Sequence, residues 1–403
     1  MKLVKVANYY NSFLKYYYQK HPEINKKSFS EQYEHLMYQS IGWSDFYSKA
    51  LKKHDIDSYE IVYNALSLQQ TWAKENNTNA KDLDILTQQI KFHQPDIIWF
   101  QDSFSFDAEY IKFLKKEIRS VKLLIGNSCA PYTKSNLKNL KVFDFVTTCS
   151  PVFVNDFEKN GIKPLLLYHA FAPEILSRIG EQSKEMDIVF AGSLIPRKGF
   201  HFERKKFLEK IATNENIDFS FYGNLFNHRY ADVIKQQVLY GLKEIIQKTG
   251  TSKFFSKSVK YKKVENLDEF PQYLRISKSL QKKYNGQLYG IDMYRKLAKA
   301  KLTFDVQGEI GGDYVATMRV FEATGIGLCL LLENKKNVQD LFEIDKEIVT
   351  FNSFDEAIEK INWLLNNKHK LSEIGEAAQA RVLKDHTYDN RAEKLYDYIR
   401  NFI

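Results

Sequence analysis

The sequence predicts an α/β protein made of two doubly wound domains, each a parallel β-sheet covered by helices on both faces. Two observations support this fold class. At 403 residues the chain exceeds the size at which one hydrophobic core usually keeps growing. Short, nearly continuous apolar runs also alternate with segments of helical period, a pattern typical of parallel sheets that are buried on both faces.

Six apolar runs in the first half of the chain predict buried strands, and a helical segment at 107–120 lies between two of them. The runs are 2–8, 56–64, 95–101, 121–127, 143–149 and 163–169. We expect this half, residues 1–178, to form an N-terminal domain.

A second series of strands follows the polar stretch 177–185, which is the best candidate for a linker. The runs are 186–193, 217–224, 300–306, 327–333 and 347–352, followed by helical segments at 354–367 and 372–386. We expect residues 186–387 to form a C-terminal domain, with ligands at the carboxyl ends of its strands in a cleft between the two domains.

One segment, about 225–283, interrupts this alternation. It is long and basic, and at 253–263 it mixes lysines with aromatic side chains. Two interpretations stay open: a solvated, partly helical insertion, or a contact with an acceptor or an anionic surface.

Composition limits which ligands and which cellular location are expected for the protein. The formal net charge of +9 favours anionic ligands, and the three cysteines are expected to be reduced, buried thiols. The N-terminus lacks the apolar core of a signal peptide, and no run is long enough to span a membrane. We therefore expect a cytoplasmic protein, with peripheral contact to the inner face of the membrane through the basic insertion as the alternative.

The clearest motif is IVFAGSLIPRKGF at 188–200, where a strand leads through Gly192 and Ser193 to Arg197 and Lys198. A glycine lets the backbone approach a ligand closely, and amides combined with cations suit a diphosphate. The alternative is a solvated basic loop.

A second motif, GGDYVATMRVFEATGIG at 311–327, predicts a helix that begins near Asp313 and presents free amides. Arg319 and Glu322 are three residues apart and share a helix face, and Glu322 could bind both hydroxyls of a ribose. The alternative is a surface ion pair. Tyr222 and Gly223, which end the second strand of this domain, are candidates for the nucleotide base pocket.

The chain resembles the group-1-like glycosyltransferases, and within them a branch related to spore-maturation proteins. The resemblance covers most of the chain apart from roughly 225–280. It rests on FAGSLIPRKGF at 190–200, GQLYGIDMYRKLAKAKLTFDV at 286–306, TMRVFEATGIGLCLLLE at 317–333, DLFE at 340–343, and SIGWSDFYSKALKKHDID at 40–57. It implies a GT-B architecture with two Rossmann-like domains, in which the first is the acceptor side and the second binds the donor. The last helix (388–403) would cross back to the first domain.

The sequence departs from this family at one informative position. Many retaining relatives carry a glutamate eight residues before the one that corresponds to Glu322, and here that position is Tyr314. We keep Tyr314 among the donor-binding candidates, and the stereochemistry stays open. Glu309 and Asp313 are acidic residues nearby, but out of register.

An inverting reaction needs a general base on the acceptor side. Asp45, which we expect to open the first long helix, is the first candidate, and Asp102, at the end of a strand, is the second. His169, at another strand end, could act as a base or as a donor to a phosphate. The alternatives are a favourable helix-dipole residue for Asp45, a capping residue for Asp102 and a structural histidine for His169.

The sequence therefore predicts a nucleotide-sugar-dependent glycosyltransferase acting on a glycan or lipid-linked acceptor, in bacterial surface polysaccharide or glycoconjugate synthesis. The expected donor is a UDP-, GDP- or dTDP-sugar. No metal is expected, because the Asp55–Asp57 and Asp82–Asp84 pairs are of a kind common by chance. The alternatives are an epimerase or hydrolase acting on the nucleotide sugar and, remotely, a nucleic-acid-binding module, although no nucleic-acid partner is expected.

Overall fold

The computed structural model describes residues 1–129, 132, 134–195, 201–225, 230–251, 270, 275–308 and 311–403. The chain divides into two compact units, one formed by Met1–Val189 with Leu288–Ile403 and the other by Phe190–Gln287. The predicted division into domains at 1–178 and 186–387 stays a prediction.

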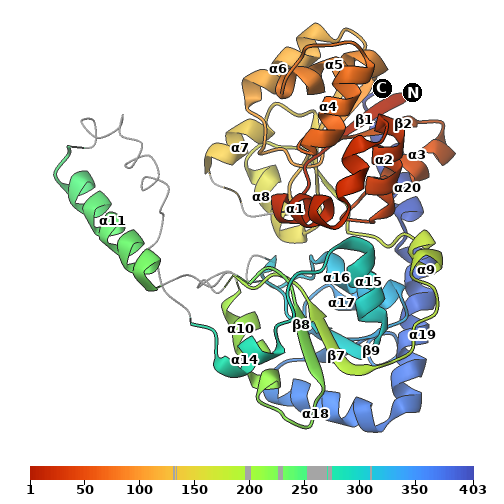
Figure 1. The fold of residues 1–403 in the computed structure, drawn as a ribbon, viewed down its shortest axis with the longest axis vertical. Helices are drawn as coiled ribbons and strands as arrows, with labels where there is room; N and C mark the ends of the chain where they lie inside the picture. The colour runs from red at the N-terminus through yellow and green to blue at the C-terminus, as the bar shows by residue number, and fades with distance from the viewer. Residues whose placement is uncertain are drawn as a thin grey trace. The chain divides into compact units, whose positions relative to one another are not determined.

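The first half of the chain forms a six-stranded sheet in the order β2-β1-β3-β4-β5-β6, in which all neighbouring strands run parallel (Figure 1). The strands are β1 (Lys2–Ala7), β2 (Asp57–Val62), β3 (Ile97–Phe100), β4 (Leu123–Asn127), β5 (Phe145–Thr148) and β6 (Pro164–Leu166). Each lies inside one of the six apolar runs in this half of the sequence.

Helices follow the strands of this sheet, as a doubly wound fold requires. They are α1 (Asn11–Lys20), α2 (Phe29–Tyr38), α3 (Phe46–Leu51), α4 (Leu66–Glu75), α5 (Leu83–His93), α6 (Ala108–Glu117), α7 (Lys134–Leu140), α8 (Pro151–Lys159) and α9 (Glu174–Ile179). Two short 3₁₀ turns lie at Pro22–Lys26 and Lys52–His54.

Side chains along β1 alternate between the two faces of the sheet, and both faces are buried. Val4 and Val6 enter a large apolar cluster with residues of α5, α6 and α8. The side chain of Lys5 lies between them in sequence and is fully buried, where its Nζ pairs with Glu60 at 3.0 Å. Burial lowers the pKa of Lys5 and raises that of Glu60 to about 7, because the protein interior disfavours both charges.

The second sheet has the order β11-β10-β9-β7-β8. Its strands are β7 (Met186–Ala191), β8 (Phe219–Tyr222), β9 (Ala300–Asp305), β10 (Cys329–Glu333) and β11 (Val349–Phe351). The associated helices are α10 (Phe202–Ala212), α14 (Lys278–Lys283), α15 (Gly290–Ala298), α16 (Met318–Gly325), α17 (Val338–Leu341), α18 (Phe354–Asn366) and α19 (Lys368–Asp385). All five strands again lie within the predicted runs.

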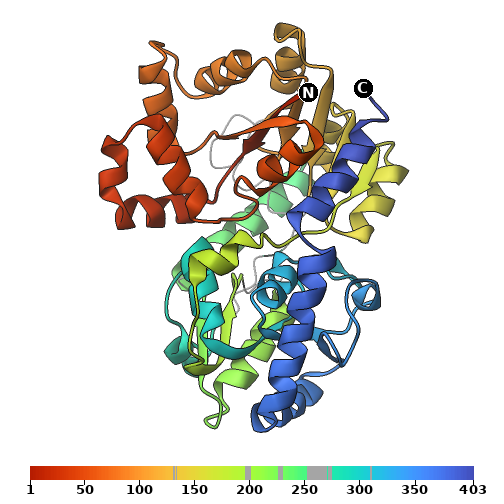
Figure 2. The same ribbon diagram turned by 90° about the vertical axis from the view of Figure 1, so that its right-hand side faces the viewer.

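The last helix, α20 (Tyr388–Ile399), returns to the first sheet, where it packs against α3 (Figure 2). Tyr388 contacts the rings of Phe46 and Tyr47 at centroid distances of 5.0 Å each, and Tyr398 contacts Phe145 at 4.8 Å. These aromatic contacts bury the inner face of α20.

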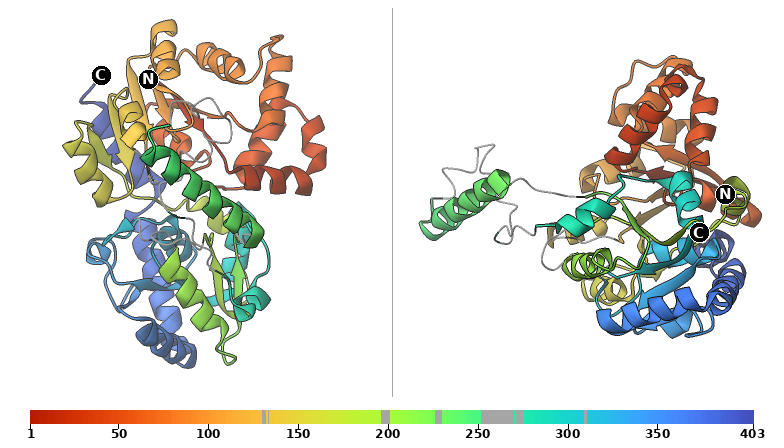
Figure 3. Two further views of the ribbon diagram at one scale, coloured as in Figure 1. Left: turned by 90° about the vertical axis from the view of Figure 1, so that its left-hand side faces the viewer. Right: turned by 60° about the horizontal axis from the view of Figure 1, so that its bottom comes forward.

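In the basic insertion the structure describes α11 (Tyr230–Lys248), one uninterrupted helix of 19 residues (Figure 3). The lysine-rich and aromatic stretch 253–263 lies outside the described residues. Among the helices that the structure describes, none is both long and apolar enough to cross a membrane.

One predicted helix start is wrong and another is right in position. Residues 311–314 form a turn, and α16 begins only at Met318, so Asp313 does not open it. Asp45 does open a helix, α3, but this helix is only six residues long and comes after the longer helices α1 and α2, so it is not the first long helix.

Candidate functional site

The carboxylate of Glu322 on α16 is held by two side chains. Tyr294 on α15 donates its hydroxyl to Oε1 at 3.2 Å, and Arg319 Nη1 lies 2.9 Å from Oε2. Only 8% of the Glu322 side chain and 15% of the Arg319 side chain are exposed. A buried ion pair of this kind is costly to desolvate, so it is weak evidence for stability and better evidence for a site.

The residues before α16 are fixed by buried polar groups rather than by helical hydrogen bonds. Asp305, at the end of β9, accepts hydrogen bonds from Thr317 and, at 2.7 Å, from Gln307. The Thr317 side chain therefore does not cap the helix that it precedes. The first amides of α16 are left without a side-chain cap, and they carry the positive end of the helix dipole.

Asn337 also fixes the residues that lead into α16. It accepts a hydrogen bond from the amide of Val315 at 2.7 Å and donates to the carbonyl of Val315 at 3.1 Å. Tyr314, which precedes Val315, is half-buried. This pairing explains why residues 313–317 stay non-helical although the sequence suggested a helix there.

Asp313 lies at the surface, in a turn. Its carboxylate pairs with Lys336 at 2.8 Å, and about two thirds of each side chain is exposed. Hydrogen bonding to Lys336 lowers the pKa of Asp313. A surface hollow of about 460 Å³ lies here, and it is lined by Asp313, Asn334, Lys335, Lys336 and Gln339.

In the smaller unit, the loops after β7 and β8 are joined to each other. The amide of Gly192 donates to the carbonyl of Tyr222 at 2.9 Å, and the side chain of Asn224 donates to that of Ser193 at 3.4 Å. Gly223 has a φ of +147°, and a Cβ there would come within 2.0 Å of the Gly192 carbonyl oxygen, so only glycine fits. Arg197 and Lys198 lie outside the described residues.

Arg204 and His201 support the loop after β7. Arg204 Nη1 donates to the carbonyl of Ser193 at 3.1 Å and lies 3.1 Å from His201 Nε2, while the amide of Ile195 lies 3.1 Å from His201 Nδ1. Because a neutral imidazole has only one acceptor nitrogen, the ring accepts from one of these two donors at a time. Burial, followed by the charge of Arg204, lowers the pKa of His201 to about 3.

On the acceptor side, Asp102 follows β3 and is half-buried. Its Oδ1 accepts from the amide of Phe104 at 3.1 Å, while its Oδ2 accepts from Asn8 at 3.0 Å and from Ser105 at 2.5 Å. The carboxylate thus closes its own turn, which is the capping role considered as the alternative, and it stays partly open to solvent.

Asp45 is more enclosed than Asp102. Its Oδ2 pairs with Lys49 at 3.1 Å, its side chain is 13% exposed, and it forms no side-chain cap for α3. Oδ1 is buried and makes no hydrogen bond to the described residues. An unpaired buried carboxylate oxygen is unusual, and it is the kind of group that a ligand can satisfy.

His169 follows β6 and lies beside Trp43, whose Nε1 donates to His169 Nδ1 at 3.4 Å. Burial, followed by the positive charge of Arg391, lowers the pKa of His169 to about 4. The imidazole is therefore neutral at physiological pH, which makes it a weak base.

Tyr10 connects the acceptor-side residues with α16. Loss of water around its hydroxyl, then the charges of Glu322 and Asp102, raise the pKa of Tyr10. The Tyr10 side chain is 72% exposed, so the two neighbouring charges, rather than burial, are the informative part. They indicate that Asp102 and Glu322 act on the same hydroxyl group.

Residues 197–397, about half of the chain, match the family model described as glycosyl transferase-like. The chain belongs to this glycosyltransferase family. No curated protein matches the sequence.

Solved structures share the fold of this glycosyltransferase along its whole length. HepE of Anabaena, in complex with UDP-glucose, superposes with a TM-score of 0.55 at 13% identity, with 100% of both chains covered. A glycosyltransferase from Rickettsia africae gives 0.52 at 10% identity, covering 100% of this chain and 98% of its own. The sucrose-phosphate synthase of Thermosynechococcus elongatus gives 0.55 at 8% identity, with the same coverage. The predicted GT-B fold and the glycosyltransferase class are confirmed, whereas the spore-maturation branch stays a prediction.

The structure of the glycosyltransferase brings together only some of the predicted site residues. Arg319 contacts Glu322, and Gly192 and Ser193 contact the loop of Tyr222 and Gly223. Asp45 and Asp313 instead pair with nearby lysines. Each of these roles stays a prediction.

Several residues of the site escaped the sequence reasoning. Tyr294 lies in the stretch 286–306, on which the family resemblance partly rests, but nothing in the sequence around it marks it as a site residue. The hydrogen bonds of Gln307 and Asn337 depend on how the loop before α16 folds back, which spacing does not reveal. Arg204 was hidden in a basic helical segment, where a solvated role is the ordinary one.

Proposed function

We propose that this glycosyltransferase moves a sugar from a UDP-, GDP- or dTDP-linked donor to a glycan or lipid-linked acceptor in bacterial surface polysaccharide or glycoconjugate synthesis. The observation that carries the proposal is the buried Glu322 carboxylate, held by Arg319 and Tyr294 beside the uncapped start of α16. The UDP-glucose complex of HepE, a structure of the same fold, supports a nucleotide-sugar donor.

The donor diphosphate would lie at the start of α16. Met318 and Arg319 supply amides at the positive end of the helix, and a phosphate needs such donors as negative charge develops on the departing diphosphate. Arg197 and Lys198, which the sequence predicts as diphosphate ligands, would add positive charge. This combination of amides and cations lets a GT-B site stabilise the leaving group without a metal.

Glu322 would accept hydrogen bonds from the two ribose hydroxyls of the donor. Its Oε1 and Oε2 are positioned by Tyr294 and Arg319, so the carboxylate is oriented before the nucleotide arrives. Binding of a pre-oriented group costs little additional conformational entropy.

Nucleotide binding tests this assignment. We expect Glu322→Ala to weaken binding of the preferred nucleoside diphosphate by about 10- to 100-fold, since a lost charged hydrogen-bond partner costs about 1.5–3 kcal/mol. Titration calorimetry with UDP, GDP and dTDP measures the affinity and identifies the base. Glu359→Ala, an exposed glutamate on α18, is the matched control. Wild-type affinity in a folded Glu322→Ala enzyme would exclude the ribose role.

For the acceptor we propose Asp102 as the general base. Its carboxylate is partly open to solvent, whereas Asp45 is paired with Lys49 and enclosed.

Asp102→Asn should lower kcat by about 10²- to 10⁴-fold while the donor affinity stays unchanged, because only proton removal from the acceptor is lost. Asp45→Asn, in the same assay with purified acceptor, provides the comparison. The assignment fails if Asp45→Asn, rather than Asp102→Asn, abolishes transfer.

A further inference from the structure

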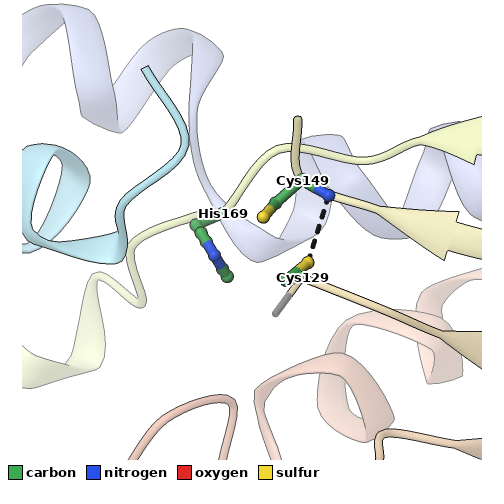
Figure 4. Close-up of side chains that lie close together, drawn as sticks. All are labelled: Cys129, Cys149 and His169. Atoms are coloured by element: carbon green, nitrogen blue, oxygen red, sulfur yellow. Dashed lines mark hydrogen bonds between the residues drawn. The ribbon is translucent and has the colours of Figure 1, made fainter. Parts of the chain in front are cut away.

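Three side chains that bind soft metal ions meet at the carboxyl edge of the first sheet. Cys129, Cys149 and His169 follow β4, β5 and β6, which are consecutive neighbours in that sheet. One ligand atom of each lies within 4.8 Å of the other two (Figure 4). Local spacing does not reveal this cluster, because the three residues are far apart in sequence and parallel pairing alone brings them together.

Two members of the cluster are already linked to each other. The amide of Cys149 donates to Cys129 Sγ at 3.1 Å, the dashed contact in Figure 4. Cys149 is buried, while Cys129 and His169 are only partly buried, so the cluster has an open side through which an ion can enter.

The backbone of His169 is held in place. Arg391 Nε donates to the carbonyl of His169 at 3.3 Å, which fixes the residue. At 3.4 Å the Trp43 contact to Nδ1 is a long hydrogen bond. A metal bound through that nitrogen would displace only this weak contact.

We propose that Cys129, Cys149 and His169 form a binding site for one Zn²⁺ or a similarly thiophilic divalent ion, with a fourth position left to water. Bond lengths of about 2.3 Å to sulfur and about 2.0 Å to nitrogen place tetrahedral ligand atoms roughly 3.5 Å apart. The observed spread of up to 4.8 Å therefore needs a contraction on the order of 1 Å. Both thiols release their protons on binding.

This site is separate from the donor chemistry. It departs from the sequence-based expectation of a metal-free protein, and it gives His169 the role of a ligand instead of a base. The ion would join the ends of three strands in the acceptor-side sheet, while the diphosphate keeps its amides and cations.

Cobalt titration tests the proposal on the full chain. Reduced protein is freed of metal with a chelator and titrated with Co²⁺, whose thiolate charge-transfer and tetrahedral d–d bands report the ligand set. We expect saturation at one ion per chain, with displacement of the bands by Zn²⁺. Cys149→Ser and His169→Asn should each weaken binding by about 10-fold or more. Cys329→Ser, which removes the third, buried thiol on β10, should leave the bands unchanged.

Thermal unfolding confirms that each variant is folded, and Cys129→Ser gives a second, less buried test of the sulfur ligands. Absence of a thiolate-to-cobalt band in the reduced wild type overturns the proposal, as do bands that persist in both cysteine variants. Formation of a Cys129–Cys149 disulfide in air, with no metal uptake by the reduced form, also overturns it and leaves a redox-active cysteine pair.

Discussion

At the scale of single residues, buried histidines show how local hydrogen bonds set a protonation state. His386 donates from Nε2 to the carbonyl of Leu341 at 2.9 Å, and its Nδ1 lies 2.9 Å from Arg391 Nη2, which can only donate. The neutral ring therefore has one tautomer. Burial, which outweighs the other influences on this ring, lowers the pKa of His386 to about 4, and the charge of Arg391 acts in the same direction.

This depressed pKa predicts acid destabilisation. Between the folded value of about 4 and the unfolded value of about 6.5, the unfolded chain binds more protons, so stability is complete above pH 6.5 and is lost as the pH falls towards 4. For His386 the loss is on the order of 3 kcal/mol. His386→Gln, which keeps a donor for Leu341, should be less stable at pH 7 and decline less steeply below it.

Urea denaturation at several pH values measures how steeply the free energy of unfolding changes with pH. His35, His93, His169 and His201 have pKa values lowered in the same direction, so the wild-type curve contains five histidine contributions and the variant isolates one of them. The exposed His369, changed to Gln, should leave the slope as it is. Identical slopes in wild type and His386→Gln would refute the assignment.

At the scale of elements, the sequence predicted the strands well and the loops between them poorly. Every described strand lies within a predicted apolar run, because strands buried on both faces need continuous apolar residues. The start of α16 was misplaced by about five residues, since Asn337 and Gln307 hold residues 315–316 in a non-helical form. These partners are distant in sequence, and local propensity carries no information about them.

Gly290, at the start of α15, illustrates a contact that only the structure explains. Its φ is +49°, and a Cβ would come within 1.9 Å of the carbonyl oxygen of Gln39, which also accepts from the amide of Ile291 at 2.8 Å. Gly290→Ala should therefore destabilise the protein by about 2–4 kcal/mol, from backbone strain and steric overlap together. Denaturant unfolding provides the value.

Gly161→Ala is the matched control, because it introduces backbone strain without a steric overlap. It has a φ of +71°, but nothing lies within 4 Å of the position that a Cβ would occupy, so Gly161→Ala should cost only about 1 kcal/mol. Equal losses in both variants would mean that the close approach to Gln39 has no energetic consequence.

At the scale of the whole molecule, the larger unit contains the entire first sheet and much of the second. The order of elements predicted two doubly wound sheets and the family resemblance implied the GT-B fold, whereas the candidate site could be predicted only in part. Arg319 and Glu322 are neighbours on one helix, so their spacing revealed their pairing. The pairing of Tyr294 with Glu322, and the meeting of Cys129, Cys149 and His169, depend on chain crossings that spacing does not encode.

The return of α20 to α3 predicts how this unit unfolds. Tyr388 is almost fully buried against Phe46 and Tyr47, so Tyr388→Ala should cost about 3–5 kcal/mol, whereas Tyr388→Phe loses only a weak hydrogen bond to Gly42 at 3.4 Å. Because α20 follows α19 of the second sheet directly, loosening it should affect both sheets at once.

Two spectroscopic probes can follow the unfolding of the first sheet and the loss of all helices separately. Three tryptophans, Trp43, Trp72 and Trp99, are buried in the first half of the chain, so fluorescence reports mainly on the first sheet, while far-ultraviolet circular dichroism reports on all helices. We expect both probes to give one coincident urea transition for the larger unit, shifted equally by Tyr388→Ala, because a cooperative unit exposes its surface in a single step. If Tyr388→Ala instead separates the two transitions, the first sheet unfolds on its own, and the contact between α3 and α20 is then a hinge between independently stable parts rather than a shared core.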